Sequence, residues 1–417
     1  MTGQRVWAGD NATFRGGAIV RAVHTWVTPH PVALLTGNAG SDETRVLAAG
    51  SEPWASFIAE HAFDEAPRRR AMANRPVWSL PRLFDSLPAE VDLVTVRVDR
   101  LTARWLFRQP HLTVPEWVNM TTTLPPDLGQ WRRGRHGKSL DKDLRWVNQS
   151  NLVVEVSQQE EDLAEFYQRY YLPHVSARFG ARAYARPFAE LRHLQQRGGL
   201  VWVRREGQRI HGGVYFEQDG TLYNVVAAPL RGDRNWMEQG AHTAALWHLM
   251  EHAQRSGCKR VSLGATRPIL TDGALRYKRK FHAAFMHDPQ LWYDFVVAWQ
   301  ALTPGVTTLL TRSPLVYRLG AGFAAAGCLA GEAGTQAEGI RHLSRYLWTE
   351  GLQRLFLVSP EGWSPEVTAP QRVTLLSPET ACRADPAAWA AEGERAGALA
   401  GSVGSVVNRS RPGSKER

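Results

Sequence analysis

The stretch SLGATRPILTDGALRYKRKF, residues 262–281, contains the pattern that decides the fold. Residues 259–263 carry apolar side chains at alternate positions, which predicts a strand. The Asp-Gly pair at 272–273 then predicts a tight turn, and Asp272 is a residue type that caps helix starts. We therefore expect a strand, a turn and a short helix over 272–281, in that order.

Upstream of this stretch, three short strands are joined by hairpin turns. The strands are predicted over 200–204, 210–216 and 221–228, where apolar and β-branched residues recur. Glu206-Gly207 and Asp219-Gly220 separate them, and Asp-Gly between two such runs is a strong signal for a hairpin. The three strands are therefore expected to form an antiparallel meander.

Further elements surround the meander and complete one domain. A strand is expected over 152–156, a helix with a capping box at Ser157 and Glu160, a helix from Pro187, a helix over 237–256 ending at Gly257, and a strand over 291–299. The predicted order over 152–299 is thus β-α-α-β-β-β-α-β-α-β.

The flanking regions have weaker patterns. They predict a helix over 53–63, strands over 91–98 and 117–124, a basic connector over 128–144, helices over 317–328 and 339–347, a strand over 355–358 and a disordered tail from Ala391. The connector contains Arg132, Arg133, Arg135, His136, Lys138 and Lys142.

Composition limits the classes of function. The chain has 417 residues, a formal net charge of +10 and 43% hydrophobic residues, which fits a globular protein with anionic partners. Its three cysteines, at 258, 328 and 382, form no cluster, so we expect neither a metal site nor a disulfide framework. Because the start has no secretory pattern and the longest apolar run, 319–330, is short, a cytoplasmic location with at most peripheral membrane contact is expected.

The order of elements, together with residues 257–281, resembles the GNAT superfamily, and more narrowly its Fem-like branch. That branch includes bacterial tRNA-dependent aminoacyl transferases and polysaccharide-biosynthesis acetyltransferases. The stretch 166–180, FYQRYYLPHVSARFG, is similar to the first-helix motif of the branch. Two departures stand out: His282 replaces the usual Gly after Phe281, and Arg234, Met237 and Gly240 only approximate the family's phosphate-loop pattern.

The resemblance implies an α+β fold with a mixed, mostly antiparallel sheet flanked by helices, in two tandem GNAT-like halves. Residues 1–150 would form a degenerate first half and 151–299 the catalytic domain. Residues 300–390 would pack on the first half and complete it, and 391–417 would be a tail.

The resemblance also implies where an acyl carrier binds. In GNAT folds the fourth and fifth strands part, here expected after Ala228, and the following helix offers free N–H groups to a pyrophosphate. The implied cofactor is acetyl-CoA or another acyl-CoA. The residues expected to bind it are Val225, Val226, Ala227, Arg231, Arg234, Gln239, Gly240 and Ala241.

Four residues are candidates for the chemistry of acyl transfer. Lys278 would contact substrate or polarise a carbonyl, and Tyr277 would protonate the leaving group; a solvated face and a core aromatic are the simpler interpretations. His211 would act as base or be a core histidine, and Asp272 would be catalytic or only a helix cap. For substrate binding the candidates are His174, Arg178, Tyr171 and Arg267.

Three functions remain open at this point. The first is an acyl-CoA-dependent N- or O-acyltransferase acting on a sugar, amino sugar or amino acid derivative, small or lipid-linked, in envelope or exopolysaccharide synthesis. The second is a tRNA-dependent aminoacyl transferase acting on a peptidoglycan precursor, with residues 132–142 meeting the RNA backbone. The third is a non-catalytic binding module.

Overall fold

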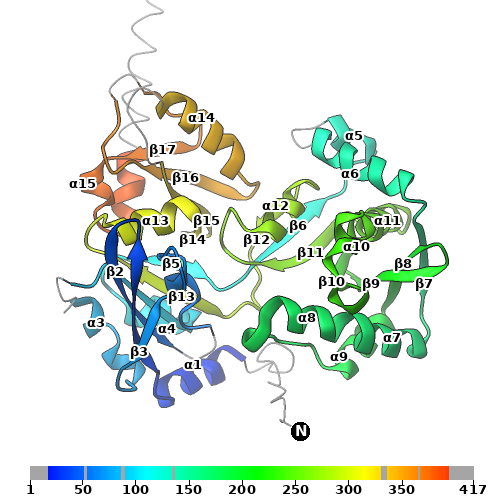
Figure 1. Cartoon of the computed structure of the whole chain (residues 1–417), viewed down its shortest axis with the longest axis horizontal. Helices are drawn as coiled ribbons and strands as arrows, with labels where there is room; N and C mark the ends of the chain where they lie inside the picture. Colours follow the sequence, from blue (N-terminus) through cyan, green and yellow to red (C-terminus); the bar gives the residue numbers. More distant parts are fainter. Residues whose placement is uncertain are drawn as a thin grey trace, which may run out of the picture.

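The computed structural model describes residues 17–50, 54–85, 90–133, 137–329, 336–364 and 367–393. Within them, the largest sheet has seven strands in the order β12-β6-β11-β10-β9-β8-β7. Its bounds are β6 (Val118–Thr123), β7 (Val153–Ser157), β8 (Gly198–Arg205), β9 (Gln208–Gln218), β10 (Thr221–Pro229), β11 (Arg260–Thr266) and β12 (Ala284–Met286). This sheet and its helices form the green body on the right of Figure 1.

The predicted meander is present as β8, β9 and β10, and β7 adds a fourth antiparallel strand at its edge. Both hairpins turn through pairs of residues with positive φ, Glu206-Gly207 and Asp219-Gly220. Such paired left-handed residues define the turn type that matches the twist of antiparallel strands. β11 then returns parallel to β10 after a helical crossover.

Helices cover both faces of this sheet. On one face lie α7 (Glu160–Phe166), the π-helical turn Tyr167–Tyr171, α8 (Leu172–Phe179) and α9 (Phe188–Gln195), which bury an aromatic cluster against β8 and β9. On the other lies α11 (Ala241–Arg255). The wide π-helical turn comes just before Pro173, which has no N–H for a regular helical bond.

Several predicted boundaries were wrong in detail. Gln159 occupies the N-cap position of α7 without a side-chain capping bond, and Ser157 accepts a hydrogen bond from the Gln159 amide, so the capping box is not formed. The helix expected over 237–256 is split into α10 (Arg234–Glu238) and α11, because Gly240 has a left-handed φ of 87°. The described parts of the basic connector are helical and form α5 (Gly129–Arg133) and α6 (Gly137–Gln149), while Arg135 and His136 lie outside the described residues.

A second sheet has the order β3-β1-β2-β4-β13-β5. It contains β1 (Val32–Ala39), β2 (Asp42–Gly50), β3 (Arg68–Ala71), β4 (Leu93–Asp99), β5 (Leu112–Pro115) and β13 (Tyr293–Ala298). Its helices are short, namely α1 (Gly17–Val27), α2 (Phe57–Glu60), α3 (Arg82–Asp85) and α4 (Arg100–Leu106). The helix expected over 53–63 is therefore reduced to α2.

The two sheets are built as tandem halves that exchange a strand. In the first half the chain runs β4, α4, β5, β6, and in the second it runs β11, α12 (Gly273–Arg279), β12, β13. β6 leaves the first sheet and pairs with β11, while β13 leaves the second sheet and pairs with β4. The boundary predicted at residue 150 thus falls between α6 and β7, but one strand from each side of it lies in the opposite sheet.

The third sheet, β14-β15-β16-β17, corrects one prediction. It contains β14 (Leu315–Leu319), β15 (Gly322–Cys328), β16 (Leu352–Val358) and β17 (Val373–Leu376), with α13 (Pro304–Arg312), α14 (Gln336–Leu347) and α15 (Pro378–Ala381). The helix predicted over 317–328 is a hairpin that turns at Gly320, whose φ is positive. Its small residues Ala324 to Ala326 alternate between two hydrophobic cores, one shared with each half.

Predictions for the C-terminal end had mixed outcomes. The helix expected over 339–347 and the strand over 355–358 are present as α14 and β16. A helix covers 386–393, and the rest of the predicted disordered tail lies outside the described residues. Within those residues, no helix has the length and apolar character needed to cross a membrane.

Candidate functional site

β10 and β11 pair only over their first three residues. The parallel ladder runs from Thr221↔Arg260 to Tyr223↔Ser262 and stops there, although β10 continues to Pro229. The strands therefore part after Tyr223, five residues earlier than predicted (228 − 223). Beyond that point no described strand pairs with the edge of β10 that faces β11.

The parted segment is exposed although it belongs to a central strand. Residues 223–227 of β10 are all half-buried, with no alternation, whereas Leu222 and Ala228 on either side are buried. A bulge at Val225 interrupts the pairing of β10 with β9. Since a strand covered on both faces should be buried throughout, this pattern marks an unpaired and partly exposed edge of β10, which we call the cleft between β10 and β11. Val225, Val226 and Ala227, expected to bind a carrier, line it.

Cationic and imidazole side chains from four elements converge beside this cleft. His174 lies on α8, His242 on α11 and Lys278 on α12. Besides burial, neighbouring positive charges contribute to lowering the pKa of each of these three side chains. Arg178 of α8 acts on all three, and Arg234 of α10 acts on His174. This concentration of positive charge favours an anionic ligand.

Lys278 is held at the end of β11. Its Nζ donates hydrogen bonds to the carbonyl oxygens of Gly264 and Ala265, at 2.9 and 2.8 Å. Desolvation lowers the pKa of Lys278 to about 7; Asp272 partly offsets this and Arg178 adds to it. At neutral pH the amine is therefore partly uncharged, which an ordinary surface lysine is not. The predicted alternative, a solvated face, does not describe it.

His211 is a core histidine, which was one of the two predicted alternatives, and His242 is a residue that the sequence reasoning missed. His211 is 0% exposed on β9, so it reaches no substrate directly. Its Nε2 lies 3.2 Å from Nδ1 of His242, the second residue of α11. Desolvation first, then neighbouring cations and imidazoles, lower the pKa of His242 to about 4, so it is neutral at pH 7. The available signal was a His-Thr pair at the start of an otherwise Ala/Leu-rich helix.

Tyr277 and Asp272 have structural partners. The Tyr277 hydroxyl lies 3.1 Å from the Thr243 hydroxyl, and its ring is 5.1 Å from that of His242. Burial raises the pKa of Tyr277 well above its usual value. Asp272 Oδ1 accepts hydrogen bonds from the amides of Ala274 and Leu275 and from Thr266, so it caps α12 as the simpler interpretation predicted.

The start of α11, expected to bind pyrophosphate, is covered. Gly240 is buried and Ala241 is 0% exposed. A Cβ on Gly240 would lie 3.3 Å from a methyl carbon of Val147 on α6. Gln239 accepts a hydrogen bond from Arg205, which occupies its side chain. An anion at this helix start would therefore require α6 to move.

The loop before α10 remains accessible. Arg231 and Arg234 are exposed, and Arg231 has a left-handed φ of 56°. Gly232 is packed against α8, because a Cβ there would lie 3.1 Å from Cα of His174. The loop is thus fixed beside His174, with its two arginines pointing to solvent.

The other two residues predicted to bind substrate are buried in packing contacts. Tyr171 is buried, and its hydroxyl accepts a hydrogen bond from the Arg186 amide. Arg267 is 7% exposed, with its guanidinium 3.5 Å from the ring centroid of Trp54 and 3.6 Å from that of Trp117. Both tryptophans lie before residue 150, so Arg267 packs the second half against the first.

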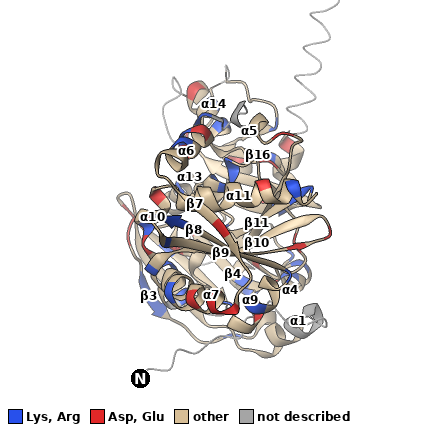
Figure 2. Ribbon diagram, turned by 90° about the vertical axis from the view of Figure 1, so that its right-hand side faces the viewer, with Lys and Arg blue, Asp and Glu red and all other residues tan. Residues whose placement is uncertain are grey.

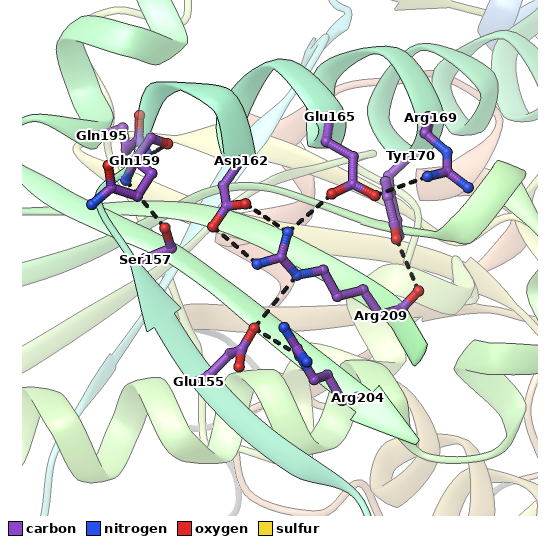
Figure 3. A network of polar contacts seen from close by, with 10 residues as sticks. All are labelled: Glu155, Ser157, Gln159, Asp162, Glu165, Arg169, Tyr170, Gln195, Arg204 and Arg209. Atoms are coloured by element: carbon purple, nitrogen blue, oxygen red, sulfur yellow. Dashed lines mark hydrogen bonds and ion pairs between the residues drawn. The ribbon is translucent and has the colours of Figure 1, made fainter. Parts of the chain in front are cut away.

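A polar cavity of about 440 Å³ lies between α7, the π-helical turn and the β8–β9 hairpin. Figure 3 shows the network beside it: the Arg209 guanidinium bonds Asp162 and Glu165 and stands near Glu155. The guanidinium groups that Arg204 and Arg209 would offer to a ligand are already paired with the carboxylates of Glu155 and Asp162. We therefore assign this network to fixing the first helix on the sheet.

The strand order, the crossover and the parted strands together define the architecture. The fold is of GNAT type, in two tandem halves. No protein-family model and no curated protein matches this chain.

Several solved structures resemble the chain. FemX is 11% identical, with a TM-score of 0.34, and the match covers 66% of this chain and 90% of that one. The C-terminal domain of a putative lysylphosphatidylglycerol synthetase from Agrobacterium fabrum is 12% identical, with a TM-score of 0.30 and coverages of 63% and 80%. A GCN5-related N-acetyltransferase from Sphaerobacter thermophilus is 14% identical, with a TM-score of 0.32 and coverages of 64% and 76%. These scores are low, so the fold assignment rests on the topology above.

Proposed function

We propose that the cleft between β10 and β11 transfers an acyl group from a thioester or ester carrier onto an amine or hydroxyl. The observation that supports this most strongly is the unpaired, half-exposed edge at 224–227 beside the cationic cluster. An extended carrier arm can pair with that edge as an added strand would. An N–H near Val226 would then face the oxyanion of the tetrahedral intermediate.

The charges near the cleft favour a phosphorylated carrier, and acyl-CoA is our first candidate. Arg231 and Arg234 are exposed at the cleft entrance and suit phosphate oxygens. Because the start of α11 is covered, these arginines, rather than Gly240 and Ala241, would bind the phosphates, and Lys278 would lie at the reacting carbonyl. His174 and Arg178 would face the acceptor, for which a sugar, amino sugar or amino acid derivative of the cell envelope is the proposed class.

An aminoacyl-tRNA is the second candidate donor, and one observation favours it. The helix that covers Gly240, α6, carries exposed Lys138, Lys142 and Arg145. Blue segments mark Lys and Arg along α6 in Figure 2. Such a basic helix at the cleft suits an RNA backbone better than a compact pyrophosphate. The chemistry in the cleft would be the same, with an ester in place of a thioester.

Titration calorimetry with acetyl-CoA and with charged tRNA separates these proposals. Saturable acetyl-CoA binding that Arg234→Ala weakens about tenfold supports the first, since a charge-assisted bond is worth about 1.5–3 kcal/mol. Binding of charged tRNA that Lys142→Ala weakens, without acetyl-CoA binding, supports the second. Binding of neither contradicts both and favours a non-catalytic module.

A further inference from the structure

The two histidines at the cleft form a hydrogen-bonded pair that the transfer reaction can use. His242 Nδ1 and His211 Nε2 are 3.2 Å apart, and one of these nitrogens must donate to the other. His211 is fully buried, and its Nδ1 has no hydrogen-bond partner among the described residues. His242 is half-buried, and its Nε2 is not among the buried unpaired atoms, so this nitrogen remains accessible.

We propose that His242 is the general base of the transfer reaction, with His211 as the residue that positions it. This inference rests on the proposed function and adds a catalytic residue to it. In the required arrangement His242 carries its proton on Nδ1 and donates it to Nε2 of His211, and the proton of the neutral His211 ring lies on its buried Nδ1. The bare Nε2 of His242 then faces the cleft and can accept a proton.

The proton and bonds balance through one transfer. The acceptor nitrogen or oxygen attacks the carrier's carbonyl carbon and gives its proton to Nε2 of His242. The tetrahedral intermediate collapses as the bond from carbon to the carrier's sulfur or oxygen breaks. The His242 imidazolium then returns the proton to that leaving atom, so that no other reactant is needed.

The surroundings explain why a buried partner is needed. The groups facing His242 are His211 on β9, His174 and Arg178 on α8, and Tyr277 and Lys278 on α12. The cations among them oppose a positive charge on His242. A neutral acceptor behind Nδ1 is the contact that stabilises the imidazolium, and His211, which is uncharged at neutral pH, supplies it. An anionic ligand bound to the cations would stabilise it further.

Diethyl pyrocarbonate, which acylates accessible unprotonated imidazoles, tests the pair on the full chain without any donor or acceptor. We expect labelling of His242, found by peptide mass mapping, at a rate that is flat from about pH 6 to about pH 8, since its pKa is about 4. His248→Gln, a half-buried histidine of the same helix, should leave this rate unchanged. An unlabelled His242, or a rate that rises through about pH 6.5, would overturn the proposal.

Two variants of His211 test the positioning role. His211→Gln keeps an acceptor for the Nδ1 proton, and the labelling rate should stay within about twofold; His211→Leu removes it, and the rate should fall about tenfold. Equal rates in the two variants would overturn the role of His211. Should either variant fail to fold, nitrogen NMR of the wild type decides: a proton on Nε2 of His242 rather than on Nδ1 contradicts the proposal. None of these results depends on whether acetyl-CoA or tRNA binds.

Discussion

Each half of the chain contains an equivalent pair of parallel strands, but the two pairs differ in how far they remain hydrogen-bonded. In the first half, β2 and β4 pair over five positions, from Val46↔Leu93 to Gly50↔Arg97, up to the last residue of β2. In the second half, β10 and β11 pair over three and then part. A Cβ on Gly50 would lie 2.6 Å from the Arg97 carbonyl oxygen, so the first pair leaves no room for a carrier.

The segments that connect the two parallel strands in each half also differ, in the length of their helices. The second half has α10 and the 15-residue helix α11 between its parallel strands, whereas the described residues between β2 and β4 contain short helices, α2, α3 and the 3-10 helix Val77–Ser79. The first half thus keeps the sheet and lacks both the cleft and the helix beside it. This comparison indicates that the fold is duplicated and that the proposed chemistry belongs to the second copy.

The largest expected effect is on the unfolding free energy, and it comes from substitutions in the two exchanged strands, β13 and β6. The second residue of β13 is Asp294, which is 0% exposed and accepts hydrogen bonds from Arg318 at 2.9 and 3.1 Å. The second residue of β6, the other exchanged strand, is Asn119. Asp294→Ala should cost about 3–5 kcal/mol of unfolding free energy, because it leaves a half-buried arginine without its partner. Asn119→Ala should cost about 1 kcal/mol. Equal losses in urea denaturation would contradict the difference between the swapped strands.

Lys278 and its counterpart test which half is catalytic. Each lies six residues after the capping aspartate of its helix (278 − 272 and 105 − 99), and the counterpart is Trp105. Lys278→Ala should lower the rate of acyl transfer about a hundredfold, as expected for loss of an electrostatic group at the reacting carbonyl. Trp105→Ala should leave the rate within about twofold. A rate that depends on Trp105 and not on Lys278 would reverse the assignment.

The lowered pKa of Lys278 also gives a pH dependence. The pKa of this amine is about 10.5 in the unfolded chain and about 7 in the folded chain. The unfolded chain therefore binds more protons between these values, and stability rises with pH across this window. Lys278→Met should therefore raise Tm by on the order of a few degrees at about pH 6, and the gain should shrink toward about pH 10. A gain in Tm that does not change with pH would mean that the pKa of Lys278 is not lowered in the folded chain.

The smallest effect tests the repeat itself. Asp99 caps α4 by accepting from the Thr102 amide at 3.0 Å, and Asp272 caps α12 in the same way. Alanine at either position should cost about 1 kcal/mol, and asparagine, which also caps, much less. If Asp272→Asn kept its stability but lost transfer activity, Asp272 would be catalytic as well as structural.

The local elements of the second half were predictable from the sequence because their signals are local. Glu206-Gly207 and Asp219-Gly220 specify hairpins through their backbone conformations, and the parallel return of β11 follows from the crossover helix. The resemblance then supplied the expectation that two strands part. The position of the parting depends on the bulge at Val225 and on Gly264, which no short pattern encodes.

Pairing between distant segments was not predictable in the same way. The pattern of 291–299 predicts a strand but carries no information about its partner, which lies in the other half. The small residues of 322–328 fit a helix by propensity, and only their burial between two cores makes them a strand. His242 becomes a candidate base only through its distance to His211, and Gly240 loses its predicted role only through Val147.

Hydrogen exchange with acetyl-CoA or charged tRNA added is the most direct measurement of the central claim, that β10 and β11 open a carrier site that β2 and β4 do not. In the free protein, amides of 224–228 should exchange faster than those of 46–50, because one edge of β10 is unpaired. The carrier that binds should slow exchange at 224–228 and leave 46–50 unchanged. Slow exchange at 224–228 in the free protein, or protection that appears at 46–50 instead, would contradict the account.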